Sequence, residues 1–267
     1  MKADFSLSAD EVRTVEVAGA ALEVSLYTGD AQSPTIVLLH EGLGSVAMWR
    51  DFPSQVAAVT GCPVMVYSRQ GYGHSMPRMA SYAADFMHIE ALQVLPVLLE
   101  ALDIDNPVLF GHSDGGSIAL IHAAAHSVVG LIVMAPHIFV EQRTVTSIAK
   151  LLKNIDGTDF FTRLGRYHED PHHAFRGWND IWLAPEFKDW NIRGEVALIS
   201  APVLAIQGDS DQFGTMAQID GIAAGASGPV KLLKLADCGH SPHRDQVEAV
   251  LKAARTFING LEGGQHG

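Results

Sequence analysis

The chain contains little cysteine, few basic residues and no long apolar run, and each shortage excludes a class of protein. Cys62 and Cys238 are far apart and lack the spacing of metal ligands, so no disulfide framework is implied. Acidic residues outnumber basic ones by 30 to 18, which disfavours nucleic acid and anionic membranes as partners. No run approaches the ~18 apolar residues that span a bilayer, and the N-terminus lacks the apolar core of a signal peptide. We therefore expect a soluble, cytoplasmic protein.

Eight short segments have the composition of β-strands. The first two alternate apolar and polar side chains on either side of a small-residue turn, which indicates an antiparallel hairpin at residues 14–17 and 22–27. The other six are mostly continuous apolar runs, which are typical of central strands of a parallel sheet covered on both faces. These runs are residues 35–39, 63–67, 107–110, 131–134, 202–206 and 230–235.

Helical patterns separate these strands and complete the expected fold. They lie at residues 48–59, 85–102, 117–125, 215–224 and 245–258. Strands that alternate with helices after a leading hairpin predict an α/β fold. Its sheet is mostly parallel, eight-stranded and twisted, with helices on both faces.

One interval, residues 137–195, interrupts the alternation. It offers helical patterns at 144–154 and 160–167, turn signals at 170–173 and 184–186, and no convincing strand. A connection of this length is rarely structureless in a compact domain. We therefore predict a helical lid inserted into one core domain, which is formed by residues 1–136 and 196–267.

The segment from Val108 to Gly116 runs from an apolar strand through a Gly-x-Ser-x-Gly turn into a helix. A serine on so sharp a turn is strained, and the turn requires almost no side chain two residues before and after it, as at Gly111 and Gly115. The turn presents the Ser113 hydroxyl at the start of a helix, where free N–H groups favour developing negative charge. This context predicts that Ser113 is a nucleophile.

A serine nucleophile requires a base and a carboxylate that orients the base. In parallel α/β sheets, reactive side chains gather at the carboxyl ends of the strands. Asp209 and Asp211 follow the second-last predicted strand, and His240 and His243 follow the last one. His240 comes directly after a glycine in that loop, whereas we expect His243 to start or cover the final helix.

With Ser, Asp and His in this order, the chain resembles the α/β-hydrolase fold superfamily over nearly its whole length. In that family the acid stands three residues after a turn glycine, which maps it onto Asp211 and leaves Asp209 as a turn former. The resemblance implies a catalytic triad of Ser113, His240 and Asp211 that works without a cofactor or a metal.

Two backbone N–H groups would have to stabilise the oxyanion of such a reaction. One belongs to Asp114, the residue after the nucleophile. The loop at residues 39–45 resembles the family's His-Gly-x-x-Gly-Ser segment, with Glu41 where glycine is usual, and the second donor maps onto Gly42. Because Asp114 and Glu41 are both acidic, we expect a more negative pocket than in related proteins.

Three further residues are candidates for contact with the substrate. Arg69 lies in a stretch that resembles the family's Asp-x-Arg-Gly-x-Gly-x-Ser segment, and it could bind a substrate carboxylate or be an ordinary ion-paired arginine. Trp178 and Trp182 belong to the aromatic-rich lid. Their positions indicate an apolar substrate pocket or, equally, the small core of the lid itself.

These features predict a serine hydrolase that cleaves a small carboxylic ester or related acyl compound through an acyl-enzyme. The same residues serve C–C bond hydrolases, perhydrolases and lyases of this fold. A small-molecule receptor on a hydrolase scaffold is the alternative outside the enzymes, whereas a haloalkane dehalogenase is disfavoured because it needs a carboxylate in place of Ser113. A small-molecule substrate is the expected partner, and a homodimer is left open.

Overall fold

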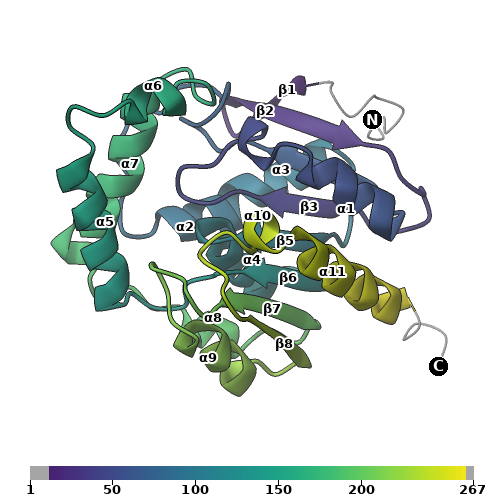
Figure 1. Ribbon diagram of the computed structural model, residues 1–267. Helices are drawn as coiled ribbons and strands as arrows, with labels where there is room; N and C mark the ends of the chain where they lie inside the picture. The colour runs from purple at the N-terminus through teal and green to yellow at the C-terminus, as the bar shows by residue number, and fades with distance from the viewer. Residues whose placement is uncertain (1–11, 263–267) are drawn as a thin grey trace.

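The computed structural model, which describes residues 12–262, is built around one sheet of eight strands in the order β1-β2-β4-β3-β5-β6-β7-β8 (Figure 1). The pairs β1/β2 and β2/β4 are antiparallel, and every other neighbouring pair is parallel. The predicted fold class is therefore confirmed. The strands are β1 (Val12–Val17), β2 (Ala20–Tyr27), β3 (Ile36–Leu39), β4 (Val64–Tyr67), β5 (Val108–His112), β6 (Gly130–Met134), β7 (Val203–Gly208) and β8 (Val230–Leu235).

The leading hairpin turns more tightly than the sequence suggested. Val17 pairs with Ala20, so only Ala18 and Gly19 form the loop. Their φ angles are 49° and 82°. Two positive φ angles in a two-residue loop match the right-handed twist of the flanking strands, and glycine adopts this conformation readily.

Alternate side chains of the central strands pack into separate cores on the two faces of the sheet. Helices α1 (Phe52–Thr60) and α11 (Val247–Glu262) cover one face, where Ile36 and Leu38 of β3 point. Val37 and Leu39 point to the other face. That face is covered by α2 (Phe86–Ile89), the π-helical turn η2 (Glu90–Val94), α3 (Leu95–Ala101), α4 (Asp114–Ala125), α8 (Arg193–Val196) and α9 (Ala217–Gly225).

Of the predicted helices, one begins later in the structure than expected and another is interrupted. The helix expected at residues 48–59 begins only at Phe52, after a short 3-10 turn, η1 (Ala47–Trp49). The helix expected at 85–102 is interrupted by η2, next to Pro96. Proline has no N–H to donate to the carbonyl four residues earlier, so a regular α-helical ladder cannot pass through it.

Strand β8 is an edge strand rather than a buried central one. Its only neighbour in the described part of the chain is β7, and most of its side chains are exposed or half-buried. Lys231 and Lys234 lie within it, and the Lys234 ammonium pairs with the Asp220 carboxylate at 2.6 Å. Lysines on an edge strand discourage pairing with another chain.

The interval between β6 and β7 is mostly helical, and its helices form a group at one end of the sheet (Figure 1). They are α5 (Gln142–Asn154), α6 (Phe160–Leu164), α7 (Pro171–Leu183) and the 3-10 turn η3 (Pro185–Phe187), followed by α8. Only one isolated β-bridge, between Phe139 and Asn191, is found in it among the described residues. Its status as a separate lid stays a prediction.

Helix α7 corrects the turn expected at residues 170–173. Asp170 is its N-cap residue, and its carboxylate accepts a hydrogen bond of 2.8 Å from the N–H of His173. Pro171 occupies the first helical position, where its missing N–H is no loss. The turn signal was therefore the start of a helix. Within residues 12–262, no helix is both long and apolar enough to cross a bilayer.

Candidate active site

The turn from β5 into α4 holds Ser113 in a strained backbone conformation, with φ 53° and ψ −119°. A β-carbon on Gly111 would lie 2.2 Å from the carbonyl oxygen of Gly115, and one on Gly115 would lie 2.1 Å from that of Leu39. Both positions require glycine because backbone atoms occupy the space a side chain would need. The sharp turn therefore depends on the two glycines that the sequence predicts for it.

The structure brings Ser113, His240 and Asp211 together in one chain of hydrogen bonds. The Nε2 atom of His240 lies 2.9 Å from the Ser113 hydroxyl, and its Nδ1 atom lies 2.8 Å from a carboxylate oxygen of Asp211. The three residues follow the carboxyl ends of β5, β8 and β7. These are three parallel strands of one sheet, which explains how positions so distant in sequence meet.

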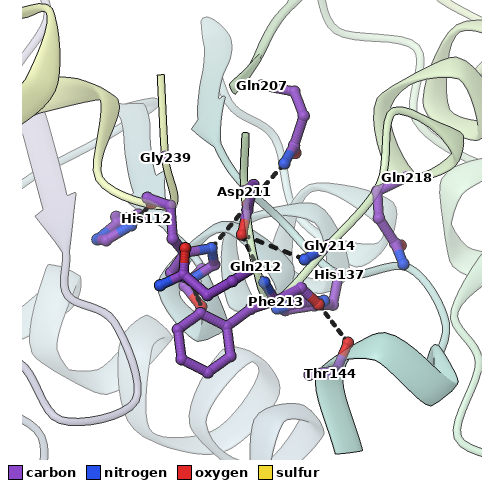
Figure 2. Close-up of polar contacts among 12 residues, drawn as sticks. His112, His137, Thr144, Gln207, Asp211, Gln212, Phe213, Gly214, Gln218 and Gly239 are labelled. Carbon is purple, nitrogen blue, oxygen red and sulfur yellow. Dashed lines mark hydrogen bonds and ion pairs between the residues drawn. The ribbon is translucent and has the colours of Figure 1, made fainter. Parts of the chain in front are cut away.

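The Asp211 carboxylate is buried and surrounded by donors. Figure 2 shows Gln207 and Gly214 beside it, and the Gln207 side chain and the Gly214 N–H donate to it at 2.6 and 3.2 Å. The Phe213 N–H donates at 2.7 Å. Burial opposes ionisation, but His240 and the N–H donors outweigh it and hold the pKa of Asp211 at about 2. Asp211 is therefore ionised at neutral pH.

Asp209 has a different environment. Its carboxylate is exposed and accepts a hydrogen bond from the neighbouring Ser210 hydroxyl at 3.0 Å. Its N–H donates to the carbonyl of Leu235 at 2.9 Å. Of the two aspartates that follow β7, only Asp211 contacts His240.

Helix α5 is bound along one side to the loop that carries Asp211. Three of its side chains donate hydrogen bonds to consecutive carbonyl groups of that loop: Arg143 to Asp211, Ser147 to Gln212 and Thr144 to Phe213, the last drawn in Figure 2. The helical interval is thus joined directly to the site. No sequence signal identified these contacts, because they depend on how α5 packs.

The carbonyl of His240 accepts a hydrogen bond of 2.7 Å from Nε2 of His112. The other ring nitrogen of His112 lies 3.5 Å from the Glu41 carboxylate. Burial opposes the ionised form of Glu41, but His112, His243 and Arg244 outweigh it and hold its pKa well below the usual range. Glu41 is therefore an ionised and paired carboxylate. His243 lies in α10 (Pro242–Asp245), just before α11.

The two predicted oxyanion donors lie on the loops that flank Ser113. Asp114 is the first residue of α4, and Gly42 lies in the loop after β3. In the described part of the chain, neither N–H donates to another protein group. Both remain free to bind a ligand oxygen.

Arg69 lies behind the Gly42 loop rather than in the cavity beside Ser113. Its guanidinium donates to the carbonyls of His40 and Glu41 at 2.7 and 3.0 Å and stacks on Tyr72. This placement differs from that expected of a substrate ligand. Arg69 instead holds the loop, and His168 holds the same loop by a hydrogen bond of 2.9 Å to the carbonyl of Leu43.

A cavity of about 130 Å³ adjoins Ser113 and His240. Its walls are mainly apolar side chains from the Gly42 loop, the Asp211 loop, α5 and α7: Leu43, Phe213, Ile148, Leu151, Trp178 and Trp182. Both predicted tryptophans thus line it, and their role in binding substrate stays a prediction. Its polar lining residues are Glu41, Asp114, His137 and Thr144.

Two polar lining residues have strongly shifted pKa values. Burial raises the pKa of Asp114 to about 6, although the nearby Arg69 guanidinium acts in the opposite direction. Burial lowers the pKa of His137 to about 3, so its ring is neutral at physiological pH. His137 was not predicted, because a single histidine after a strand carries no distinctive pattern.

A family model described as alpha/beta hydrolase fold matches residues 34–197 of the chain. Among curated proteins, the chain is similar to protein phosphatase methylesterase 1 of Mus musculus, with 28% identity over 109 residues. The matched part is 40% of this chain and 28% of that relative, so the match spans less than a third of the relative's length.

Two solved structures illustrate the likeness of fold. The enol-lactonase from Burkholderia xenovorans LB400 has a TM-score of 0.71 and 22% identity, over 92% of this chain and 100% of that one. An esterase from Exiguobacterium antarcticum has a TM-score of 0.73 and 17% identity, over 93% and 100%. At these identities the likeness establishes a common architecture.

Proposed function

The chain belongs to the α/β-hydrolase fold family, and from this we propose that it is a serine hydrolase acting on a small carboxylic ester through an acyl-enzyme. The observation that carries the proposal is the chain of hydrogen bonds from Ser113 through His240 to Asp211, at 2.9 and 2.8 Å. The names of the relatives, a methylesterase, an enol-lactonase and an esterase, agree with an ester substrate.

In the first half of the reaction, the ionised Asp211 accepts the Nδ1–H of His240, which leaves Nε2 free to take the proton of Ser113. The serine oxygen then attacks the ester carbonyl. The developing oxyanion is stabilised by the N–H groups of Asp114 and Gly42. His240 next gives its proton to the departing alcohol, which leaves the acyl group on Ser113.

The second half repeats these steps with water. His240 removes a proton from a water molecule, which attacks the acyl-enzyme and releases the carboxylic acid. Ser113 recovers its proton from His240. The cavity of about 130 Å³ favours a small acyl group, and its apolar walls favour hydrocarbon parts.

Labelling with a fluorophosphonate probe tests the nucleophile. The wild-type protein is expected to be modified at Ser113, and the Ser113→Ala variant is expected to remain unmodified. A wild-type protein that fails to react would contradict the hydrolase proposal and favour a receptor on the same scaffold.

A panel of p-nitrophenyl esters of increasing acyl length, measured beside a ring-cleavage diketone, tests the bond that is cleaved. The expected result is turnover of the short esters. Turnover of the diketone alone would replace the ester hydrolase with a C–C bond hydrolase.

A further inference from the structure

The loop that carries Asp211 has no hydrogen-bonded backbone structure of its own. In the described part of the chain, no backbone N–H or carbonyl of residues 211–214 pairs with another backbone group. The N–H groups of Phe213 and Gly214 donate to the Asp211 carboxylate, which closes the loop on itself without attaching it to its surroundings. The position of Asp211 relative to His240 therefore depends on the side chains that contact this loop.

Helix α5 and the residue before it attach the loop to the rest of the molecule. The three donors of α5 described above bind the carbonyls of residues 211–213. Glu141, just before the helix, accepts hydrogen bonds from the N–H and the hydroxyl of Thr215 at 2.9 and 2.6 Å. Four of the five residues from 211 to 215 are thus bound by one short stretch, residues 141–147.

Thr144 is the buried donor among the three. The residue is 1% exposed, whereas Arg143 is exposed and Ser147 is half-buried. Its hydroxyl donates to the carbonyl of Phe213 (Figure 2). The N–H of the same Phe213 donates to the Asp211 carboxylate at 2.7 Å, and its ring centroid lies 4.9 Å from that of His240. One buried hydrogen bond therefore holds a residue that contacts both the acid and the base.

Given the proposed hydrolysis at Ser113, we propose that Thr144 is a positioning residue for the catalytic triad. Its hydroxyl fixes Phe213, and through Phe213 it keeps Asp211 and His240 in hydrogen-bond contact. Thr144 takes no part in proton transfer. Its effect is on kcat, because His240 is positively charged in the transition state and the contact with the ionised Asp211 matters most there.

Two substitutions separate the hydroxyl of Thr144 from its role as a lining residue of the cavity. Thr144→Val keeps the shape of the side chain and removes the hydroxyl, whereas Thr144→Ser keeps the hydroxyl and removes the methyl group. The readouts are kcat and KM for a short p-nitrophenyl ester. The value of kcat is expressed per active site, counted by fluorophosphonate labelling taken to completion, so that unfolded protein is not included.

The two variants should differ in kcat and agree in KM. We expect Thr144→Val to lower kcat about fivefold to tenfold with KM nearly unchanged, as for the loss of one hydrogen bond from the transition state. Thr144→Ser should restore kcat to within about twofold of the wild-type value, because the donor to the Phe213 carbonyl is kept.

Thr146→Val is the matched control, because it makes the same exchange on the same helix. Thr146 is exposed, and its hydroxyl accepts a hydrogen bond from the Gln142 side chain at 3.2 Å instead of binding the Asp211 loop. We expect its kcat and KM to equal those of the wild type.

Arg143→Met provides a second variant, should Thr144→Val fail to fold. It removes the donor to the Asp211 carbonyl from an exposed position, where substitutions seldom affect stability. Arg143 is not among the described residues that line the cavity, so its loss should not alter KM. We expect kcat to fall about twofold to threefold, since this hydrogen bond is less buried than that of Thr144.

Each other result overturns the inference. A wild-type kcat in Thr144→Val, or in Arg143→Met where the valine variant does not fold, would mean that α5 does not position the triad. A Thr144→Ser variant as slow as Thr144→Val, or changes confined to KM, would mean that Thr144 is only a wall of the cavity. An equal loss of kcat in Thr146→Val would indicate a general disturbance of α5. Failure of the serine hydrolase proposal is distinct, because the wild-type protein itself would then not react with the fluorophosphonate.

Discussion

The Asp114→Asn substitution is expected to stabilise the protein against unfolding at pH 8. Burial raises the pKa of Asp114 from 3.8 to about 6. An acid whose pKa is higher in the folded than in the unfolded state destabilises the fold wherever it is ionised in both states. With one pKa unit equivalent to 1.36 kcal/mol, the ionised carboxylate costs about 3 kcal/mol above pH 6. Asparagine has nearly the same shape and no charge.

The pH dependence of this effect has a definite sign. The destabilisation by Asp114 is fully present above its folded pKa of about 6 and disappears as the pH falls toward 3.8. The advantage of the variant should therefore decrease from about 3 kcal/mol at pH 8 to about half of that at pH 5. Urea denaturation of both proteins at the two pH values measures it. For a domain of this size, 3 kcal/mol corresponds to roughly 6 °C in Tm.

Asp211→Asn is the matched comparison, with the opposite sign. Hydrogen bonds and the neighbouring His240 hold the pKa of Asp211 at about 2, below the ordinary 3.8. This carboxylate stabilises the fold above pH 3.8, and the contribution is lost as the pH falls toward 2. The variant should be less stable by about 2 kcal/mol at pH 8. No gain in stability for Asp114→Asn at pH 8, or a gain that is the same at pH 5, would contradict a destabilising, ionised carboxylate at this position.

Three further substitutions test the scaffold of the site. Gly115→Ala places a β-carbon 2.1 Å from the Leu39 carbonyl oxygen and should lower the free energy of unfolding, measured by urea denaturation, by about 3 kcal/mol. A variant as stable as the wild type would contradict the tight turn. Ile148→Ala enlarges the cavity, so it should lower the free energy of unfolding by about 2 kcal/mol and shift the preference among p-nitrophenyl esters to longer acyl chains. An unchanged preference would show that Ile148 does not contact the acyl group. His168→Ala leaves the buried N–H of Gly73 and the half-buried carbonyl of Leu43 without their partner. It should lower the free energy of unfolding by about 2 kcal/mol and also lower kcat/KM for a short ester, whereas unchanged values of both would contradict its role in holding the Gly42 loop.

The sheet and the turn at Ser113 could be predicted because their signals are local. A strand covered on both faces must be continuously apolar, and the turn requires glycine at Gly111 and Gly115. The sequence signal for the start of α7 is also local, but it is ambiguous. Asp170-Pro171 is equally suited to a turn and to a helix N-terminus, and only the apolar face of the following residues, which packs in the structure, decides between them.

The walls of the cavity could not be predicted, because they depend on contacts between distant segments. Ile148 and Leu151 face the site only because α5 is bound to the Asp211 loop, and no pattern within α5 distinguishes this face from an ordinary core face. Arg69 illustrates the same limit. Its charge suggested either a substrate ligand or an ordinary ion-paired arginine. Its guanidinium instead donates to the carbonyls of His40 and Glu41, which come next to Arg69 only in the folded chain.

The placement of Asp114 conflicts with two local requirements. At the N-terminus of α4 the helix dipole favours its charge, yet burial dominates and raises its pKa to about 6. Its negative charge also opposes the oxyanion that its own N–H is proposed to stabilise. Above pH 6 the ionised carboxylate therefore destabilises the folded protein, and this loss of stability is the one that Asp114→Asn should recover.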